Sequence, residues 1–207
     1  MIIRPATQLV NRVGLAFTQA LEYDKRKPFG GMIMKRKVNV WDYAGQIVQA
    51  MNPGILATTK AKDQVNTMTI GWGTLGIEWG RPVFILFVRE SRYTKQMLEE
   101  NGEFTINVPV GEFDKKILAY CGTKSGRDTD KIADLGLTLE ESEQISVPGI
   151  KELPLTLECK VIYKQDQDPT AIGEDVKKRY YPPFFPDGRG DYHTAYYGQI
   201  LDAYIIE

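Results

Sequence analysis

Histidine and cysteine are scarce in this chain of 207 residues, which contains one His and two Cys. His193, Cys121 and Cys159 are too few for a four-ligand Cys/His zinc site, and a zinc hydrolase site with two or three His is excluded. A Ser-His-Asp or Cys-His mechanism would have to use His193. The two Cys form no CxxC motif and have no visible activating partner, so we expect inert free thiols in a reducing compartment.

Net charge and long apolar runs are also lacking. The chain has 26 Lys and Arg against 27 Asp and Glu, a net charge of −1. This balance provides no general attraction to nucleic acid or to anionic lipid, so we expect neither as a partner. No segment approaches the roughly 20 apolar residues of a membrane-spanning helix, and the N-terminus lacks a secretion-signal pattern. We therefore expect a cytoplasmic protein with no membrane contact.

The charge that is present is distributed unevenly. Residues 1–40 hold eight basic and two acidic residues, a net charge of +6, which leaves −7 on the rest of the chain. Apolar residues between Leu9 and Leu21 recur at helical spacing, so we predict a basic helical extension over residues 1–40 and one domain over residues 41–207. An organelle transit peptide and an internal translation start at Met32 or Met34 are the alternatives.

Beyond residue 40, the sequence pattern predicts short strands with short helices between them. We expect strands at residues 55–60, 66–77, 83–88, 104–108, 153–164 and 192–206, and helices at residues 42–51, 94–101, 111–120 and 129–135. Strands and long helices do not alternate, which disfavours a parallel sheet and favours a mostly antiparallel barrel. The connection at residues 165–191 contains Tyr180-Tyr-Pro-Pro-Phe-Phe-Pro186, which fits either a packed Ω-type loop or a lid over a planar ligand.

Two glycine-rich segments resemble nucleotide-binding motifs only superficially. Gly71-Trp-Gly-Thr-Leu-Gly76 matches GxGxxG, but Arg81-Pro82 follows soon after, so no helix can begin inside the motif as dinucleotide binding requires. Gly122-Thr-Lys-Ser-Gly126 lacks the first glycine and the spacing of a P-loop. Glycines in a strand instead indicate bulges, or a place where a flat ligand approaches the backbone.

The segment Ser91-Arg-Tyr-Thr94 joins a buried strand to a helix. Free N–H groups of the first helical turn, the hydroxyls and Arg92 would converge there, which makes an anion site. A plain Ser N-cap with a solvated Arg is the alternative. His193 begins the last strand, directly after the aromatic segment, and either a structural or a functional role is consistent with that position.

Several segments carry a further signal in their order and spacing: Asn52-Pro-Gly-Ile-Leu-Ala-Thr-Thr59, Asn66-Thr-Met-Thr-Ile-Gly-Trp72, Arg81-Pro-Val83, Ser91-Arg-Tyr-Thr94, Gly102-Glu-Phe-Thr-Ile-Asn-Val-Pro109, Cys121-Gly-Thr-Lys-Ser-Gly126 with Asp130-Lys131, and His193-Thr-Ala-Tyr-Tyr-Gly198. Over residues 41–206 the chain resembles the flavin reductase-like family, the FMN-binding split-barrel proteins that include the flavoredoxins. This resemblance implies a mainly β fold, a six-stranded antiparallel Greek-key split β-barrel. It also implies a homodimer with FMN near the subunit interface.

The resemblance also implies where FMN would bind. The segment from Asn66 to Thr74 would run along the ring and ribityl chain, and the loop before the helix would hold the phosphate. The implied cofactor-binding residues are Asn66, Thr67, Met68, Thr69, Gly71, Trp72, Thr74, Ser91, Arg92, Thr94, Lys124 and Ser125. His193 would lie near the flavin edge as the one catalytic candidate. Gly71 replaces a Ser found in many relatives, which removes one side-chain hydrogen bond, and the insertion at residues 165–191 would reshape or close the donor site.

The implied activity is that of an oxidoreductase in which electrons pass from NAD(P)H through the flavin to an acceptor. The flavin performs the chemistry, so no acid–base pair and no metal are needed. His193 would orient the donor or offset the negative charge of the reduced flavin. Two alternatives remain: a flavoredoxin-like electron carrier that a partner protein reduces, and a non-enzymatic ligand-binding barrel.

Overall fold

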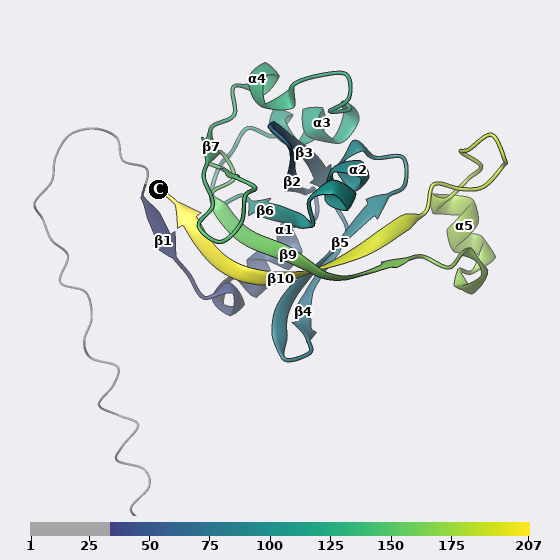
Figure 1. Cartoon of the computed structure of the whole chain (residues 1–207), viewed down its shortest axis with the longest axis horizontal. Coiled ribbons are helices and arrows are strands. Elements are labelled where there is room, and N and C mark those ends of the chain that lie inside the picture. The colour runs from purple at the N-terminus through teal and green to yellow at the C-terminus, as the bar shows by residue number, and fades with distance from the viewer. Residues whose placement is uncertain (1–33) are drawn as a thin grey trace, which may run out of the picture. The chain divides into compact units, whose positions relative to one another are not determined.

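The computed structural model describes residues 34–207 (Figure 1). The apolar helical face predicted between Leu9 and Leu21 lies outside the described residues. Within the predicted basic extension, Lys35–Lys37 form strand β1 rather than a helix and pair with Tyr204–Ile206. Tertiary pairing and acidic partners decide this, because Arg36 forms an ion pair with Glu207 at 2.7 Å. In the described residues, no helix is both long and apolar enough to cross a membrane.

The main element is an eight-stranded sheet in which all neighbouring strands are antiparallel. The strands run in the order β3-β2-β6-β9-β10-β5-β4, and β1 also pairs with β10. Their bounds are β1 Lys35–Lys37, β2 Ile55–Ala61, β3 Gln64–Ile70, β4 Gly73–Glu78, β5 Arg81–Arg89, β6 Glu103–Val108, β9 Leu155–Asp166 and β10 His193–Ile206. A separate pair joins β7 Leu139–Glu140 and β8 Gly149–Ile150. The mainly β, antiparallel fold predicted from the sequence is confirmed.

The helices are short and occupy the connections, as predicted. They are α1 Ala44–Ala50, α2 Tyr93–Glu100, α3 Lys116–Thr123, α4 Lys131–Leu135 and α5 Glu174–Tyr180, with 3₁₀ turns η1 Val40–Tyr43 and η2 Pro169–Ala171. Gly136 ends α4 in the left-handed region at φ 61°, in the role expected of it. The helix predicted at 111–120 begins later, at Lys116, because Gly111 has a φ of 78° and cannot continue a helix.

One predicted strand is in fact two. The segment 66–77 breaks at Gly71 and Trp72, so that β3 and β4 lie at opposite ends of the strand order. Gly73 opens β4 directly against Phe84, where a Cβ would lie 2.6 Å from the ring. The chain therefore leaves one end of the sheet and enters the other end within two residues, and Gly71 and Trp72 are exposed at this crossing.

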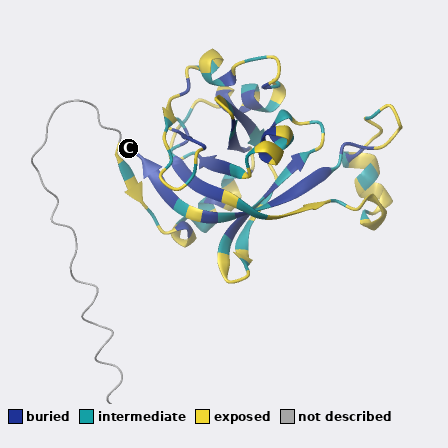
Figure 2. Ribbon diagram, in the orientation of Figure 1, coloured by how far each residue is buried: buried dark blue, intermediate teal, exposed yellow. Residues whose placement is uncertain are grey.

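Most buried side chains lie along the central strands, whereas α5 and the tip of the β4–β5 hairpin are exposed (Figure 2). The largest fully buried side chains include Tyr196, Phe84 and Phe104. Gly198 lies at a register shift of β10, and a Cβ there would approach the ring of Phe104 to 2.3 Å. The glycine expected within the last strand therefore makes room for a neighbouring ring.

Gly198→Ala is expected to lower the free energy of unfolding by about 1–3 kcal/mol, the cost of overpacking a well-filled core. Phe104 is fully buried, and a Cβ at position 198 would approach its ring to 2.3 Å. Gly76→Ala is the matched control, because a Cβ there meets no atom within 4 Å. Denaturant unfolding measures both changes, and an equal effect of the two variants would contradict the packing role of Gly198.

Candidate functional site

Two adjoining cavities lie beside β3, between the start of α2 and the first residue of β10. One has a volume of about 160 Å³ and is lined by Met68, Thr69, Ile70, Gly71, Trp72, Phe87, Arg89, Arg92 and His193. The other has a volume of about 100 Å³ and is lined by Asn66, Met68, Thr69, Ser91, Arg92, Tyr93, Thr94, Cys121, Gly122, Lys124, Ser125, Gly126 and Lys131. We call them the ring cavity and the anion cavity. They share the lining residues Met68, Thr69 and Arg92, so they lie next to each other.

Several hydrogen-bond donors at the anion cavity have no acceptor among the described residues. Neither the guanidinium of Arg92 nor the ammonium of Lys124 has a hydrogen-bond or ion-pair partner among residues 34–207. The N–H groups of the first turn of α2, at Tyr93 and Thr94, have no acceptor within the helix. Two cations and a helix N-terminus at one cavity favour a phosphate or another anion.

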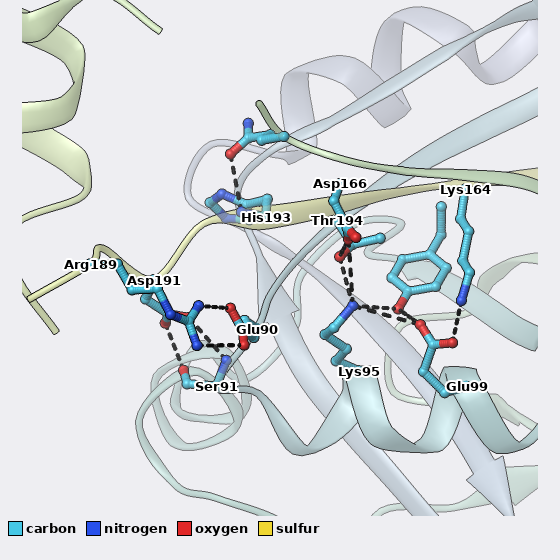
Figure 3. Close-up of polar contacts among 12 residues, drawn as sticks. Glu90, Ser91, Lys95, Glu99, Lys164, Asp166, Arg189, Asp191, His193 and Thr194 are labelled. Carbon is cyan, nitrogen blue, oxygen red and sulfur yellow. Dashed lines mark hydrogen bonds and ion pairs between the residues drawn. The ribbon is translucent and has the colours of Figure 1, made fainter. Parts of the chain in front are cut away.

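Ser91, in contrast, already has acceptors for both of its hydrogen-bond donors. Its backbone N–H and its hydroxyl donate to the two carboxylate oxygens of Asp191, at 2.9 Å and 2.6 Å (Figure 3). Asp191 is buried at the end of the 165–191 connection. The hydroxyl of Ser91 therefore does not donate into the cavity, and its bond instead fastens the long connection to the start of α2.

Asn66 and Gly126 form a cradle in the anion cavity. Asn66 is 3% exposed, and its Nδ2 donates to Thr94 Oγ1 at 3.1 Å. Within residues 34–207 its Oδ1 has no hydrogen-bond partner, and a Cβ on Gly126 would lie 2.2 Å from that oxygen. Only glycine fits at position 126, and the unpaired buried oxygen is a position where a ligand donor would satisfy an acceptor.

Lys131 adds a third positive group at the anion cavity. The side chain is 4% exposed and its ammonium donates to the carbonyls of Thr67 and Cys121, at 2.9 Å and 3.2 Å. Burial lowers its pKa, because the charged form loses hydration. The ammonium has three donors, so two backbone bonds leave one N–H for a further acceptor.

The ring cavity has flat walls. Trp72 lies with its ring centroid 5.1 Å from that of His193, and Phe87 lies 6.5 Å from His193 at an angle of 82°. Trp72 is half-exposed, whereas His193 is 7% exposed. Aromatic faces at a cavity lined by strand backbone favour a planar ligand.

His193 is neutral at physiological pH. Burial is the main cause that lowers its pKa to about 4, and the positive charge of Arg89 acts in the same direction, partly offset by Asp191. The Nδ1 of His193 is hydrogen-bonded to the hydroxyl of Tyr181 at 3.0 Å, and its backbone N–H donates to Gln167 Oε1. The side chain can therefore offer a hydrogen bond at the ring cavity, but not a positive charge.

The model of the flavin reductase like domain matches residues 50–207. The chain belongs to the flavin reductase-like family. A flavoredoxin of Desulfovibrio vulgaris (Miyazaki F) is 25% identical, with a TM-score of 0.56 over 73% of this chain and 68% of that one. A flavoredoxin from Methanosarcina acetivorans is 28% identical, with a TM-score of 0.55 over 73% and 67%. A relative in Archaeoglobus fulgidus, described only as an uncharacterized protein, is 32% identical over 62% of this chain and 72% of its own length.

Most residues predicted to bind the cofactor line one of the two cavities of this flavin reductase-like domain. Ten of the twelve do so: Asn66, Met68, Thr69, Gly71, Trp72, Ser91, Arg92, Thr94, Lys124 and Ser125. The catalytic candidate His193 also lines the ring cavity. Thr67 lines neither cavity, because its hydroxyl lies in the core and bonds Thr58 and Ala57. Thr74 is exposed on β4, beyond the crossing at Gly71 and Trp72, and also lines neither.

Several residues of the site in this flavin reductase-like domain escape the sequence reasoning. The sequence predicts a buried strand that contains Phe87 and ends just before Arg89. In the structure β5 buries Val83, Leu86 and Val88, whereas Phe87 is only partly buried and lines the ring cavity. The sequence of β5 shows no alternation of apolar and polar residues, because apolar side chains occupy both faces of the strand. Tyr181 and Asp191 come from the long connection, and no spacing rule predicts which of its residues turn back toward the site.

The two thiols of this flavin reductase-like domain are unreactive by environment, as expected. Burial raises the pKa of Cys121 to about 11, and burial raises the pKa of Cys159 well above its ordinary value. Cys121 lines the anion cavity, where its raised pKa keeps the thiol protonated at neutral pH.

Because the chain has a single histidine, the pKa of His193 can be measured directly and reports on the environment of the site. We expect His193 to titrate with a pKa of about 4. The measurement follows the NMR resonances of the histidine ring as the pH changes, in protein without an affinity tag. Because the folded pKa lies below the ordinary value near 6.5, the unfolded chain binds the proton first. The His193 contribution to stability is therefore complete above about pH 6.5 and falls as the pH approaches 4. A titration near 6.5 would mean that His193 is solvated, contrary to the structure.

Proposed function

We propose that the protein is an FMN-binding oxidoreductase that transfers electrons from NAD(P)H through the flavin to an acceptor. The observation that supports it is a pair of adjoining cavities, one lined by Arg92, Lys124 and Lys131 and the other by the aromatic side chains of Trp72 and Phe87. FMN has the same two chemical parts, a phosphate and a fused planar ring. Membership of the flavin reductase-like family supports a flavin-related redox function.

At the phosphate end, Arg92 and Lys124 would form charge-assisted bonds to phosphate oxygens, and the first-turn N–H groups of α2 would complete the set. Ser125 lies between Lys124 and Gly126 and could add a hydroxyl. Asn66 Oδ1, which has no donor among the described residues, would accept from a hydroxyl of the ribityl chain. Ser91 would contribute indirectly, because its own donors hold Asp191.

At the ring end, Trp72, Phe87 and His193 would exclude water from one side of the isoalloxazine, and Met68 and Thr69 would contact it along β3. A bound flavin supplies the redox chemistry, by accepting a hydride or electrons at its ring system. The neutral His193 could donate one hydrogen bond there. Positive potential for the reduced state would come from Arg89 and Arg92, which both line the ring cavity.

A flavoredoxin-like electron carrier that receives electrons from a protein is the second candidate. It is favoured by the two flavoredoxin structures that this chain resembles at 25% and 28% identity. The test is to mix the flavin-loaded protein with NADH or NADPH in the absence of free flavin. Loss of the visible flavin absorbance supports the reductase, whereas an unchanged spectrum with both donors supports the carrier. A protein that is colourless and binds no added flavin contradicts both functions and favours a non-enzymatic barrel.

A homodimer is part of the proposal. Ile77 and Trp79 at the tip of the β4–β5 hairpin are 68% and 63% exposed, and Trp79 contacts the half-exposed Tyr163 at a centroid distance of 6.0 Å. A second copy would cover this exposed apolar surface. Analytical ultracentrifugation tests this, and a monomer at micromolar concentration would contradict it.

Arg92→Ala is expected to weaken FMN binding about tenfold to a hundredfold, because a hydrogen bond to a charged group contributes about 1.5–3 kcal/mol. Flavin fluorescence titration of the apoprotein measures the dissociation constant. Arg81→Ala is the matched control, since Arg81 lies at the far end of β5 and donates only to Gln199. Equal dissociation constants for the wild type and Arg92→Ala would remove Arg92 from the phosphate site.

His193→Ala is expected to slow flavin reduction by NAD(P)H while FMN remains bound. Stopped-flow measurement at saturating flavin separates the two effects, because binding and reduction are recorded independently. Unchanged reduction kinetics would exclude His193 from the mechanism, and the proposal for the flavin site would then rest on the anion cavity alone.

A further inference from the structure

The loop that follows α5 is held rigidly against the site. The guanidinium of Arg89 donates to the carbonyls of Tyr180 and Asp191, at 3.0 Å and 2.7 Å, and so binds both ends of the loop. Gly190 passes so close to Tyr181 that a Cβ would lie 2.6 Å from its carbonyl oxygen. An isolated bridge pairs Pro183 with Gly190. The loop is therefore a fixed part of the structure.

Tyr181 is the residue through which this loop reaches His193. Its ring stacks on Tyr192 with centroids 4.8 Å apart, and the cation of Arg89 lies 5.1 Å from the centre of its ring. Tyr181 is 6% exposed. Three neighbours thus hold the phenol with its hydroxyl 3.0 Å from Nδ1 of His193.

The direction of that hydrogen bond follows from the acceptors available. The Tyr181 hydroxyl has no partner other than His193 Nδ1 within residues 34–207. If His193 donated from Nδ1, the buried hydroxyl proton would have no acceptor, which is costly. The unprotonated Nε2 would then have no donor among the described residues either. With Tyr181 as the donor, the hydroxyl is satisfied and the imidazole proton is on Nε2.

We propose that Tyr181 is a positioning residue that fixes His193 as the neutral tautomer protonated at Nε2, so that an N–H donor is available at the ring cavity. The Nε2 atom makes no hydrogen bond with any described residue, and His193 lines the ring cavity. A planar ligand with a carbonyl or ring-nitrogen acceptor at its edge would receive this bond. That the Nε2–H of His193 donates to a flavin rests on the proposed function, whereas the assignment of the tautomer does not.

The tautomer can be measured without any ligand, because the chain has one histidine. Tag-free apoprotein labelled with ¹⁵N histidine is recorded at pH 7.5 by long-range ¹H–¹⁵N correlation. We expect Nδ1 to resonate as an unprotonated nitrogen and Nε2 as a protonated one. In Tyr181→Phe we expect the Nδ1 resonance to shift toward the protonated position as both tautomers become populated.

Tyr192→Phe is the matched control for this measurement. It removes the same hydroxyl from the ring that stacks on Tyr181, and no hydrogen bond to His193 is lost. Its spectrum is expected to match that of the wild type. A wild-type Nδ1–H tautomer, or an identical spectrum in Tyr181→Phe, would overturn the proposal. Cooperative thermal unfolding of each variant confirms that the comparison is made on folded protein.

A double-mutant cycle then tests whether the donor is used. Tyr181→Phe is expected to weaken FMN binding about 2- to 10-fold, the range for one neutral hydrogen bond. In the His193→Ala background the same change is expected to have no further effect, because Tyr181 would act through His193. Additive effects would contradict that coupling. Absence of FMN binding in the wild type would contradict the proposed function, and would leave the tautomer result intact.

Discussion

The guanidinium of Arg89 is the group on which the site depends. It lies opposite His193 in the β5–β10 pairing, and it donates to the carbonyls at both ends of the aromatic loop. Backbone carbonyls that are shielded from water need donors, and Arg supplies several from one planar group. The same cation lines the ring cavity and adds to the effect of burial, which is the main cause of the lowered pKa of His193. One residue therefore pairs with His193 in the sheet, holds both ends of the loop and adds positive charge beside the imidazole.

The long connection is integrated into the site at two places. Asp191 accepts from the hydroxyl and N–H of Ser91 at the start of α2, and Tyr181 meets His193 at the ring cavity. Arg189 adds an ion pair with Glu90 on the adjoining surface (Figure 3). Of the two readings of the aromatic segment, these contacts support the packed loop, because Tyr181 is buried at the wall of the site. Phe184, at the tip, is exposed.

The two cavities differ in their lining, and this difference suits a cofactor with an anionic part and a planar ring. Arg92 and Lys124 are uncommitted at the anion cavity, whereas the ring cavity combines aromatic side chains and a neutral imidazole with the cations of Arg89 and Arg92. The chain therefore needs neither a metal nor an acid–base pair for the proposed chemistry. The scarcity of His and Cys is consistent with a protein whose reactive group is a bound ring.

Local patterns were sufficient to predict most elements and the anion cavity. Strand periodicity located β2, β6 and β10, Gly136 ended α4, and the strand-to-helix junction placed Arg92 beside free helix N–H groups. These features depend on neighbours in sequence, so the sequence by itself determined them. Only the tertiary structure separated β3 from β4, moved Thr74 away from the site, and brought Tyr181 and Asp191 to it. Those outcomes depend on strand order and on the path of one long loop, which contacts between distant residues decide.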